Sequence, residues 1–188
     1  MNGPDFIEVL DFWFGAPGSR ERGRPRKAWF RKSEPFDAEI RRRFLVTWER
    51  AARGELERWQ ATPLASLALV VTLDQFPRNM FRGTARAFAS DSLALAVARE
   101  TIAREFDRLL SPVERSFVYL PFEHAEDLAA QRRSLALFHA LDGEQVEYAR
   151  RHYEIIARYG RFPHRNAILG RPSTAEEIEF LKQPGSSF

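Results

Sequence analysis

The sequence predicts an all-α protein built from stacked antiparallel helix hairpins, with about seven to nine helices. Apolar residues recur every three or four positions through nearly the whole chain, which is the spacing of helices buried on one face. Strict alternation of apolar and polar residues, the pattern of a strand, never persists beyond a few residues. Short connections between the long apolar stretches favour stacked hairpins over a globin-like arrangement.

Length and composition predict a single domain that spans residues 1–188. Hydrophobic residues make up 44% of the chain, with 16 Phe and 4 Trp, which is more than a disordered chain carries. No apolar run is long enough to span a membrane, and the N-terminus lacks the pattern of a secretory signal. The absence of cysteine excludes disulfides and zinc–thiolate sites. We therefore expect a cytoplasmic protein without a membrane partner.

The net charge of +3 comes from basic and acidic residues that nearly balance and are spread through the chain. One basic cluster stands out, the segment SRERGRPRK at residues 19–27. Such a run can contact phosphates, but no aromatic residues are interleaved with it and no nucleic-acid motif surrounds it. We expect a solvated loop here and do not expect nucleic acid as a partner.

Two helices are expected before residue 55. The first, PDFIEVLDFWFG, has Pro4 in its first turn and stops at Gly15. The second has an apolar face between Ile40 and Trp48 and ends near Gly54.

The third helix is expected to be central in the fold. Thr62 is suited to the N-cap and Pro63 to the first turn. Residues 64–76 are apolar almost all round the helix, which indicates burial on every side. Pro77 should end this helix, because a residue before proline avoids the helical conformation.

Five further helices are expected after it. Ser90 or Asp91 should cap the fourth, and Ser111 with Glu114 forms the capping box of a fifth that stops at Pro121.

Two long helices are expected at about residues 125–141 and 144–159, and Gly160 should cap the second. A short amphipathic helix begins at Ser173 or Thr174.

Three segments carry more polar side chains than a turn needs, each at a proline that is predicted to end a helix. LDQFPRNMFRGT, the first segment, supplies Asp74, Gln75, Arg78, Asn79 and Arg82. LPFEHAED, the second, supplies Glu123, His124, Glu126 and Asp127. YGRFPHRNAILGRPST, the third, supplies Arg161, His164, Arg165, Asn166 and Arg171. The first and third segments share Phe-Pro followed by Arg-Asn, with His164 inserted in the later copy.

These residue types point to a site for a small anionic molecule, if the three segments converge. Guanidinium groups hold carboxylates or phosphates through two parallel hydrogen bonds, and Asn amides beside them orient a ligand. Glu123, His124 and His164 are the candidates for proton transfer near neutral pH. The remaining candidates for ligand binding are Asp74, Gln75, Arg78, Asn79, Arg82, Glu126, Arg161, Arg165 and Asn166.

A purely structural role explains the same residues. Arg and Asn side chains near helix ends often satisfy the last carbonyl groups of the helix. Arg78 and Arg165 could form ion pairs with carboxylates such as Glu123, Glu126 or Asp74 and so join helix ends. The sequence leaves both interpretations open.

No metal or cofactor is expected. Glu123, His124, Glu126 and His164 are candidate ligands, but their spacing matches no zinc or di-iron signature. The chain has no glycine-rich phosphate loop and no nucleophile elbow. His152, like His139, falls inside a predicted helix and is expected to be a surface or packing residue.

The three segments, in their order along the chain, resemble the bacterial DUF924 family, a domain of unknown function. The resemblance is carried by LDQFPRNMFRGTARAFASD, YLPFEHAEDLAAQ, LFHAL and RYGRFPHRNAILGRPSTAEEIEFL, and it runs from VLDFWFG to EEIEFL. It implies an all-α fold similar to tetratricopeptide-repeat proteins, and it implies no established activity. Because such folds often bind peptides, a helical-hairpin module for a peptide or protein partner is the alternative to the anion site.

Overall fold

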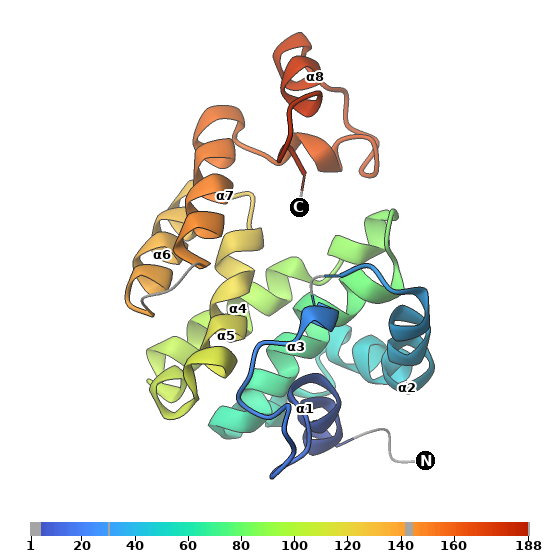
Figure 1. The fold of residues 1–188 in the computed structure, drawn as a ribbon, viewed down its shortest axis with the longest axis vertical. Coiled ribbons are helices and arrows are strands. Elements are labelled where there is room, and N and C mark those ends of the chain that lie inside the picture. The colour runs from blue at the N-terminus through green and yellow to red at the C-terminus, as the bar shows by residue number, and fades with distance from the viewer. Residues whose placement is uncertain (1–4, 30, 142–144, 188) are drawn as a thin grey trace. The chain divides into compact units, whose positions relative to one another are not determined.

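The computed structural model describes residues 5–29, 31–141 and 145–187, and within them it confirms the all-α prediction (Figure 1). These residues form eight α-helices and five short 3₁₀ helices and no strand. The α-helices are α1 (Phe6–Phe14), α2 (Glu34–Ala52), α3 (Pro63–Met80), α4 (Asp91–Ala103), α5 (Pro112–His124), α6 (Leu128–His139), α7 (Gln145–Tyr159) and α8 (Ala175–Leu181). The 3₁₀ helices are η1 (Lys27–Trp29), η2 (Glu57–Ala61), η3 (Ala85–Phe88), η4 (Phe106–Leu109) and η5 (Pro163–Arg165).

The chain divides into two compact units. Unit 1 comprises residues 1–82 and 86–121, and unit 2 comprises residues 83–85 and 122–188. Helices α1 to α4 lie in unit 1, α6 to α8 lie in unit 2, and α5 passes from unit 1 into unit 2 after Pro121. The expectation of a single domain stays a prediction.

Helix α3 forms the centre of unit 1, as its apolar sequence predicts. It packs against α1, α2 and α4, and Leu67, Val70 and Val71 are fully buried. Aromatic rings fill the space around it, with Phe44 stacked on Phe76 at 4.7 Å between ring centroids. Burial of large aromatic side chains of this kind is a main source of stability in a small fold.

The prediction that Pro77 ends α3 is wrong, because the helix continues to Met80. A proline inside a helix leaves the carbonyl four residues earlier without its usual amide donor. Here that carbonyl belongs to Leu73, and it accepts a hydrogen bond from the Ser90 hydroxyl at 2.6 Å. Ser90 also accepts from the Trp48 indole at 3.0 Å, so one buried hydroxyl compensates for the proline and joins three helices.

Pro121 likewise lies inside its helix, and the prediction that it ends α5 is wrong. The helix runs on to His124, where the amide of Gln131 on α6 closes it. The Gln131 Nε2 donates to the carbonyls of Glu123 at 2.6 Å and Ala125 at 2.8 Å. The polar residues from Asp74 to Asn79, and those at Glu123 and His124, therefore lie on helices and not in loops.

Helix starts that depend on local chemistry are confirmed. Thr62 caps α3, and Ser111 and Glu114 exchange the two hydrogen bonds of a capping box at the start of α5. Thr174 and Glu177 form the same arrangement at α8. These predictions succeed because both partners of each bond are within three residues of one another.

The basic segment 19–27 is only partly a solvated loop. Arg26 donates to the carbonyls of Phe12 at 2.7 Å and Trp13 at 2.8 Å, which lie in the last turn of α1. Arg22 donates to the Gly15 carbonyl at 3.2 Å. These side chains satisfy carbonyl groups that a helix end leaves unpaired, whereas other basic residues of the segment are exposed.

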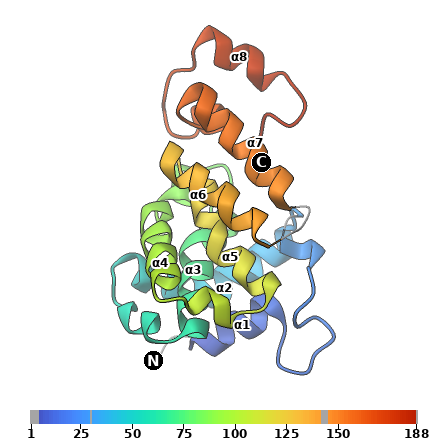
Figure 2. The same cartoon turned by 90° about the vertical axis from the view of Figure 1, so that its left-hand side faces the viewer.

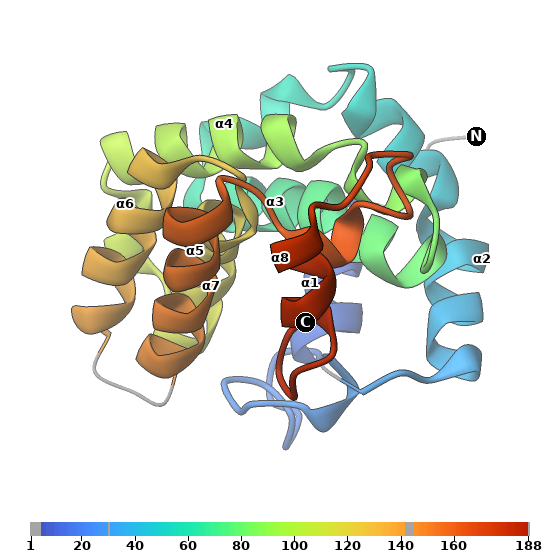
Figure 3. The same ribbon diagram turned by 90° about the horizontal axis from the view of Figure 1, so that it is seen from above.

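In unit 2, α6 and α7 pack side by side, as Figures 1 and 3 show. Helix α8 lies near the C-terminal end of α7 (Figure 2), where the rings of Phe180 and Tyr159 are 5.1 Å apart. The core of this unit is formed by Ile155, Ile156 and Phe162. None of the described helices combines the length and the apolar character needed to cross a membrane.

Candidate functional site

The residues of the first polar segment form a network within unit 1. Arg78 donates to both carboxylate oxygens of Asp91, at 2.7 and 3.0 Å, and lies 3.7 Å from the carboxylate of Asp74. Asp74 is fully buried and accepts a hydrogen bond from Gln75 at 2.6 Å. Burial opposes the charge of Arg78, but Asp74 and Asp91 outweigh this effect and raise the pKa of the guanidinium. Two carboxylates, those of Asp74 and Asp91, thus balance the charge of Arg78.

Asn79 and Arg82 both bind the same residue of α2. The Asn79 amide donates to Asp37 Oδ1 at 2.7 Å, and Arg82 Nε donates to Asp37 Oδ2 at 2.6 Å. These bonds tie the C-terminal end of α3 to the first turn of α2. Contacts of this kind are expected if Asn79 and Arg82 have a purely structural role and join helix ends.

Arg171 binds two residues of unit 2 that were predicted to bind a ligand, Glu126 and Asn166. Arg171 holds Glu126 through two hydrogen bonds of 2.6 and 2.8 Å, and it donates to Asn166 at 3.1 Å. The backbone N–H of Phe162 also donates to Glu126, at 2.7 Å. Burial alone would raise the pKa of Glu126, but the bonds from Arg171 and Phe162 lower it. These contacts fix the segment after α7 to the segment after α5.

Arg161 binds Glu177 at the start of α8. Its Nε and Nη2 donate to the two carboxylate oxygens at 2.7 and 2.8 Å. The hydrogen bonds from Arg161 lower the pKa of Glu177 to about 2, so this carboxylate is charged throughout the physiological range. Arg161 therefore holds α8 in place.

Three basic side chains lie against the fully buried ring of Phe162, and a fourth lies beside one of them. The ring centroids of His152 and His164 are each 5.6 Å from that of Phe162, and the guanidinium carbon of Arg165 lies 4.5 Å above the ring. His124 is next to His152, with 6.4 Å between ring centroids. We call His124, His152, His164 and Arg165 the basic cluster.

The hydrogen bonding of His152 defines its tautomer. Its Nδ1 is 2.8 Å from the Tyr148 carbonyl, which can only accept, so Nδ1 carries the hydrogen and Nε2 keeps a lone pair. The carboxylate of Glu123 also approaches Nδ1, at 3.4 Å. His152 and Glu123 are 5% and 4% exposed, so both groups are nearly removed from water.

His152 is uncharged at neutral pH. Burial, together with the positive charges of His124, Arg165 and His164, lowers the pKa of this imidazole to about 3, against the opposing bond to Tyr148. The nearby carboxylate of Glu123 would favour the charged imidazole, but this effect is smaller, because desolvation of an almost fully buried imidazole favours its neutral form.

Sequence reasoning placed His152 among surface or packing residues and missed its position in the cluster. The signal was available in α7, where Ala149, His152 and Ile156 recur at helical spacing and are all buried. A polar residue on an otherwise apolar stripe marks a buried group that needs specific neighbours.

Within unit 2 the structure brings the second and third polar segments together. Glu123, His124, His164 and Arg165 share one cluster, while Glu126, Arg161 and Asn166 lie in the surrounding ion-pair network. Within unit 1 the first segment forms its own network. Over the described part of the chain, no three Asp, Glu or His side chains are arranged to hold a metal ion. The assignment of roles to these residues stays a prediction.

Comparison with known proteins gives the family of the chain. A family model described as "Bacterial protein of unknown function (DUF924)" matches residues 9–185. The chain is similar to the solved structure of a protein of unknown function from Agrobacterium tumefaciens, with 44% identity, a TM-score of 0.85, and coverage of 94% of this chain and 96% of that one. No curated protein matches the chain. The chain belongs to the bacterial DUF924 family.

Proposed function

We propose that the protein binds a small anionic molecule at the basic cluster of unit 2. The observation that carries this proposal is that two imidazoles and one guanidinium lie against Phe162, with the imidazole of His124 beside that of His152. Side chains from α5, from α7 and from the segment that follows α7 contribute to it, so the fold concentrates basic groups that are far apart in sequence.

Electrostatics favours an anion in this place. Basic groups that are close together and shielded from water repel one another, and the low pKa of His152 reflects that repulsion together with its burial. A bound anion offsets the repulsion and accepts hydrogen bonds from imidazole and guanidinium groups. Arg165 is 6% exposed, so its charge acts in a poorly screened environment.

The same arrangement supports proton transfer. Nε2 of His152 keeps a lone pair, and the carboxylate of Glu123 is 3.4 Å from Nδ1 on the other side of the ring. A carboxylate that orients an imidazole is a common arrangement for general acid–base chemistry. Together with His124 and His164, these groups would serve hydrolysis or isomerisation of a bound anion.

The test is a thermal-shift and calorimetric titration with inorganic phosphate and sulfate. We expect both anions to raise the melting temperature of the wild type, and Arg165→Gln to abolish the shift. His164→Asn should weaken binding. Sulfate keeps its charge between pH 6 and pH 8, so tighter sulfate binding at pH 6 would report protonation of His124 or His164, because His152 stays neutral there.

The matched control is Arg133→Gln, which removes the same charge from an exposed position on α6. Equal responses of the Arg165 and Arg133 variants would contradict the proposal, as would the absence of any anion-induced shift in the wild type. If Arg165→Gln does not fold, the comparison of His164→Asn with Arg133→Gln decides the question.

A further inference from the structure

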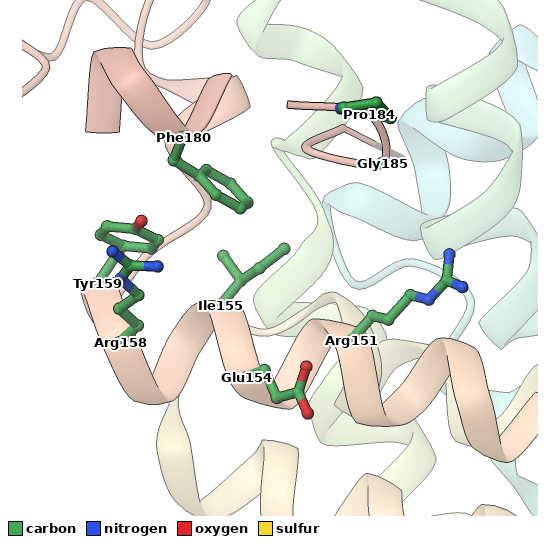
Figure 4. A pocket seen from close by; sticks show the side chains of 8 residues that line it. All are labelled: Arg151, Glu154, Ile155, Arg158, Tyr159, Phe180, Pro184 and Gly185. Atoms are coloured by element: carbon green, nitrogen blue, oxygen red, sulfur yellow. The ribbon is translucent and has the colours of Figure 1, made fainter. Parts of the chain in front are cut away.

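A concave surface lies in unit 2 along α7. It is a groove of about 510 Å³ between α7 and the segment from α8 to Gly185, shown in Figure 4. The volume falls within the range of about 300–1,000 Å³ that is typical of small-molecule sites. Ile155 of α7 and Phe180 of α8 point toward one another across it.

The middle of the groove is apolar, and its two ends differ in charge. Ile155, Phe180 and Tyr159 supply aliphatic and aromatic surface, and Tyr159 lies at one end. Arg151 lies at the opposite end, two helical turns along α7. A ligand that spans this groove therefore meets an apolar surface along its body and a cation at one end.

The charges of the groove favour a single negative charge at Arg151. This guanidinium uses Nε to bind Glu147 at 3.1 Å, and within the described residues neither of its Nη atoms has a hydrogen-bond partner. Arg158, the other arginine of the groove, is held by Glu176 at 2.9 and 2.6 Å. Arg151 thus keeps both Nη groups for a ligand, whereas Arg158 uses Nε and Nη2 for Glu176.

Two carboxylates limit the charge of the ligand. Glu147 and Glu154 lie within one turn of Arg151 on the same helix and both pair with Arg150, so these four side chains carry no net positive charge that would hold a doubly charged group. The planar fork of the Nη atoms matches a carboxylate, which carries one charge over two oxygens.

We propose that the groove between α7 and α8 binds a small amphipathic monocarboxylate. Its apolar body packs between Ile155 and Phe180, and its carboxylate accepts hydrogen bonds from the Nη atoms of Arg151. This site shares no residue with the basic cluster, although Ile155 and Phe180 belong to the same hydrophobic cluster as Phe162.

Phenylacetate is a suitable probe, and titration of ¹⁵N-labelled full-length protein followed by NMR is the measurement. We expect a Kd of about 1 mM or below for a ligand of this size, with shifts concentrated at residues 151–159 and 178–185. Phenylacetamide, which has the same shape without the charge, should bind about tenfold more weakly, and so should phenyl phosphate, which is doubly charged.

Variants separate the groove from the rest of the surface. Arg151→Gln should weaken phenylacetate binding about tenfold, whereas Arg133→Gln on α6 should leave it unchanged. Arg151 is exposed on α7, so its replacement leaves the fold intact, which circular dichroism checks. Arg165→Gln should leave phenylacetate binding unchanged, and this distinguishes the groove from the basic cluster.

The proposal is overturned if phenylacetamide or phenyl phosphate binds as tightly as phenylacetate, or if Arg133→Gln has the effect of Arg151→Gln. Shifts that avoid both residue ranges, or no binding at millimolar concentration, would overturn it too. Loss of phenylacetate binding in Arg165→Gln would assign the ligand to the basic cluster instead.

Discussion

The two copies of Phe-Pro followed by Arg-Asn, residues 76–79 and 162–166, have nearly the same sequence and different structures. The first copy lies inside α3 and continues the helix past Pro77, whereas in the second Pro163 opens the short helix η5. Arg78 is held by the two oxygens of Asp91 and lies near Asp74. Arg165 lies over the ring of Phe162, among three imidazoles.

The difference teaches that the role of an arginine is set by its neighbours and not by the motif around it. In the first copy, carboxylates surround the guanidinium and give a stabilising ion-pair network. In the second, the guanidinium lies over an aromatic ring beside imidazoles and influences the carboxylate of Glu126 from a distance, and we propose that a bound anion adds to these interactions. The following predictions test this contrast.

The largest expected effect is a loss of stability in acid that depends on His152. The folded pKa of His152 is about 3, below the unfolded value of 6.5, so the unfolded state binds the proton first as the pH falls. The stability that this residue contributes is complete above about pH 6.5 and is lost toward pH 3, by about 5 kcal/mol in total. Urea unfolding across this range measures the loss.

His152→Leu removes the titrating group and should unfold with a shallower pH dependence than the wild type. His139→Leu, at an exposed position near the end of α6, is the control and should follow the wild type. Identical pH profiles for the wild type and the His152 variant would show that His152 does not titrate differently on folding.

A smaller effect is expected at Arg78, in the first copy. Arg78→Met removes the cation that lies 3.7 Å from the buried carboxylate of Asp74 and should cost about 3 kcal/mol of unfolding free energy. Arg42→Met breaks an exposed, solvent-screened pair with Glu39 and should cost far less unfolding free energy than Arg78→Met. If the two variants lose the same stability in urea, the network around Arg78 is not the stabilising element described here.

The smallest effect concerns Pro77. Ser90→Ala removes the hydroxyl that donates to the Leu73 carbonyl and should cost about 1–2 kcal/mol. In a Pro77→Ala background, the amide of residue 77 can donate to that carbonyl, so the cost of Ser90→Ala should fall by about half. A double-mutant cycle in urea measures this coupling, and equal costs in both backgrounds would contradict it.

Local features of the fold could be predicted from the sequence, and contacts between distant residues could not. The capping boxes at Ser111 and Thr174 and the buried helix at residues 64–76 follow from neighbouring residues and from periodicity. The helix ends at Pro77 and Pro121 were mispredicted because Ser90 compensates for the first proline and Gln131 closes the helix beyond the second.

For the candidate site, too, the residues could be predicted from the sequence, whereas their long-range partners could not. Residue types alone singled out Glu123, His124, His164 and Arg165, which do gather in unit 2. The partners of Arg78 and Arg161, Asp91 and Glu177, depend on how helices pack, and the sequence offers no spacing rule for such pairs.

The amide of Gln131 has a consequence for the order in which the chain assembles. The end of α5, which carries Glu123 and His124, is closed by a side chain that belongs to the next helix. During synthesis, the last turn of α5 emerges before Gln131 does, so its final carbonyls stay exposed to water until α6 has formed and docked. The end of α5, which supplies His124 to the basic cluster, is therefore capped only once α6 has packed against it. The basic cluster reaches its final structure only after that step.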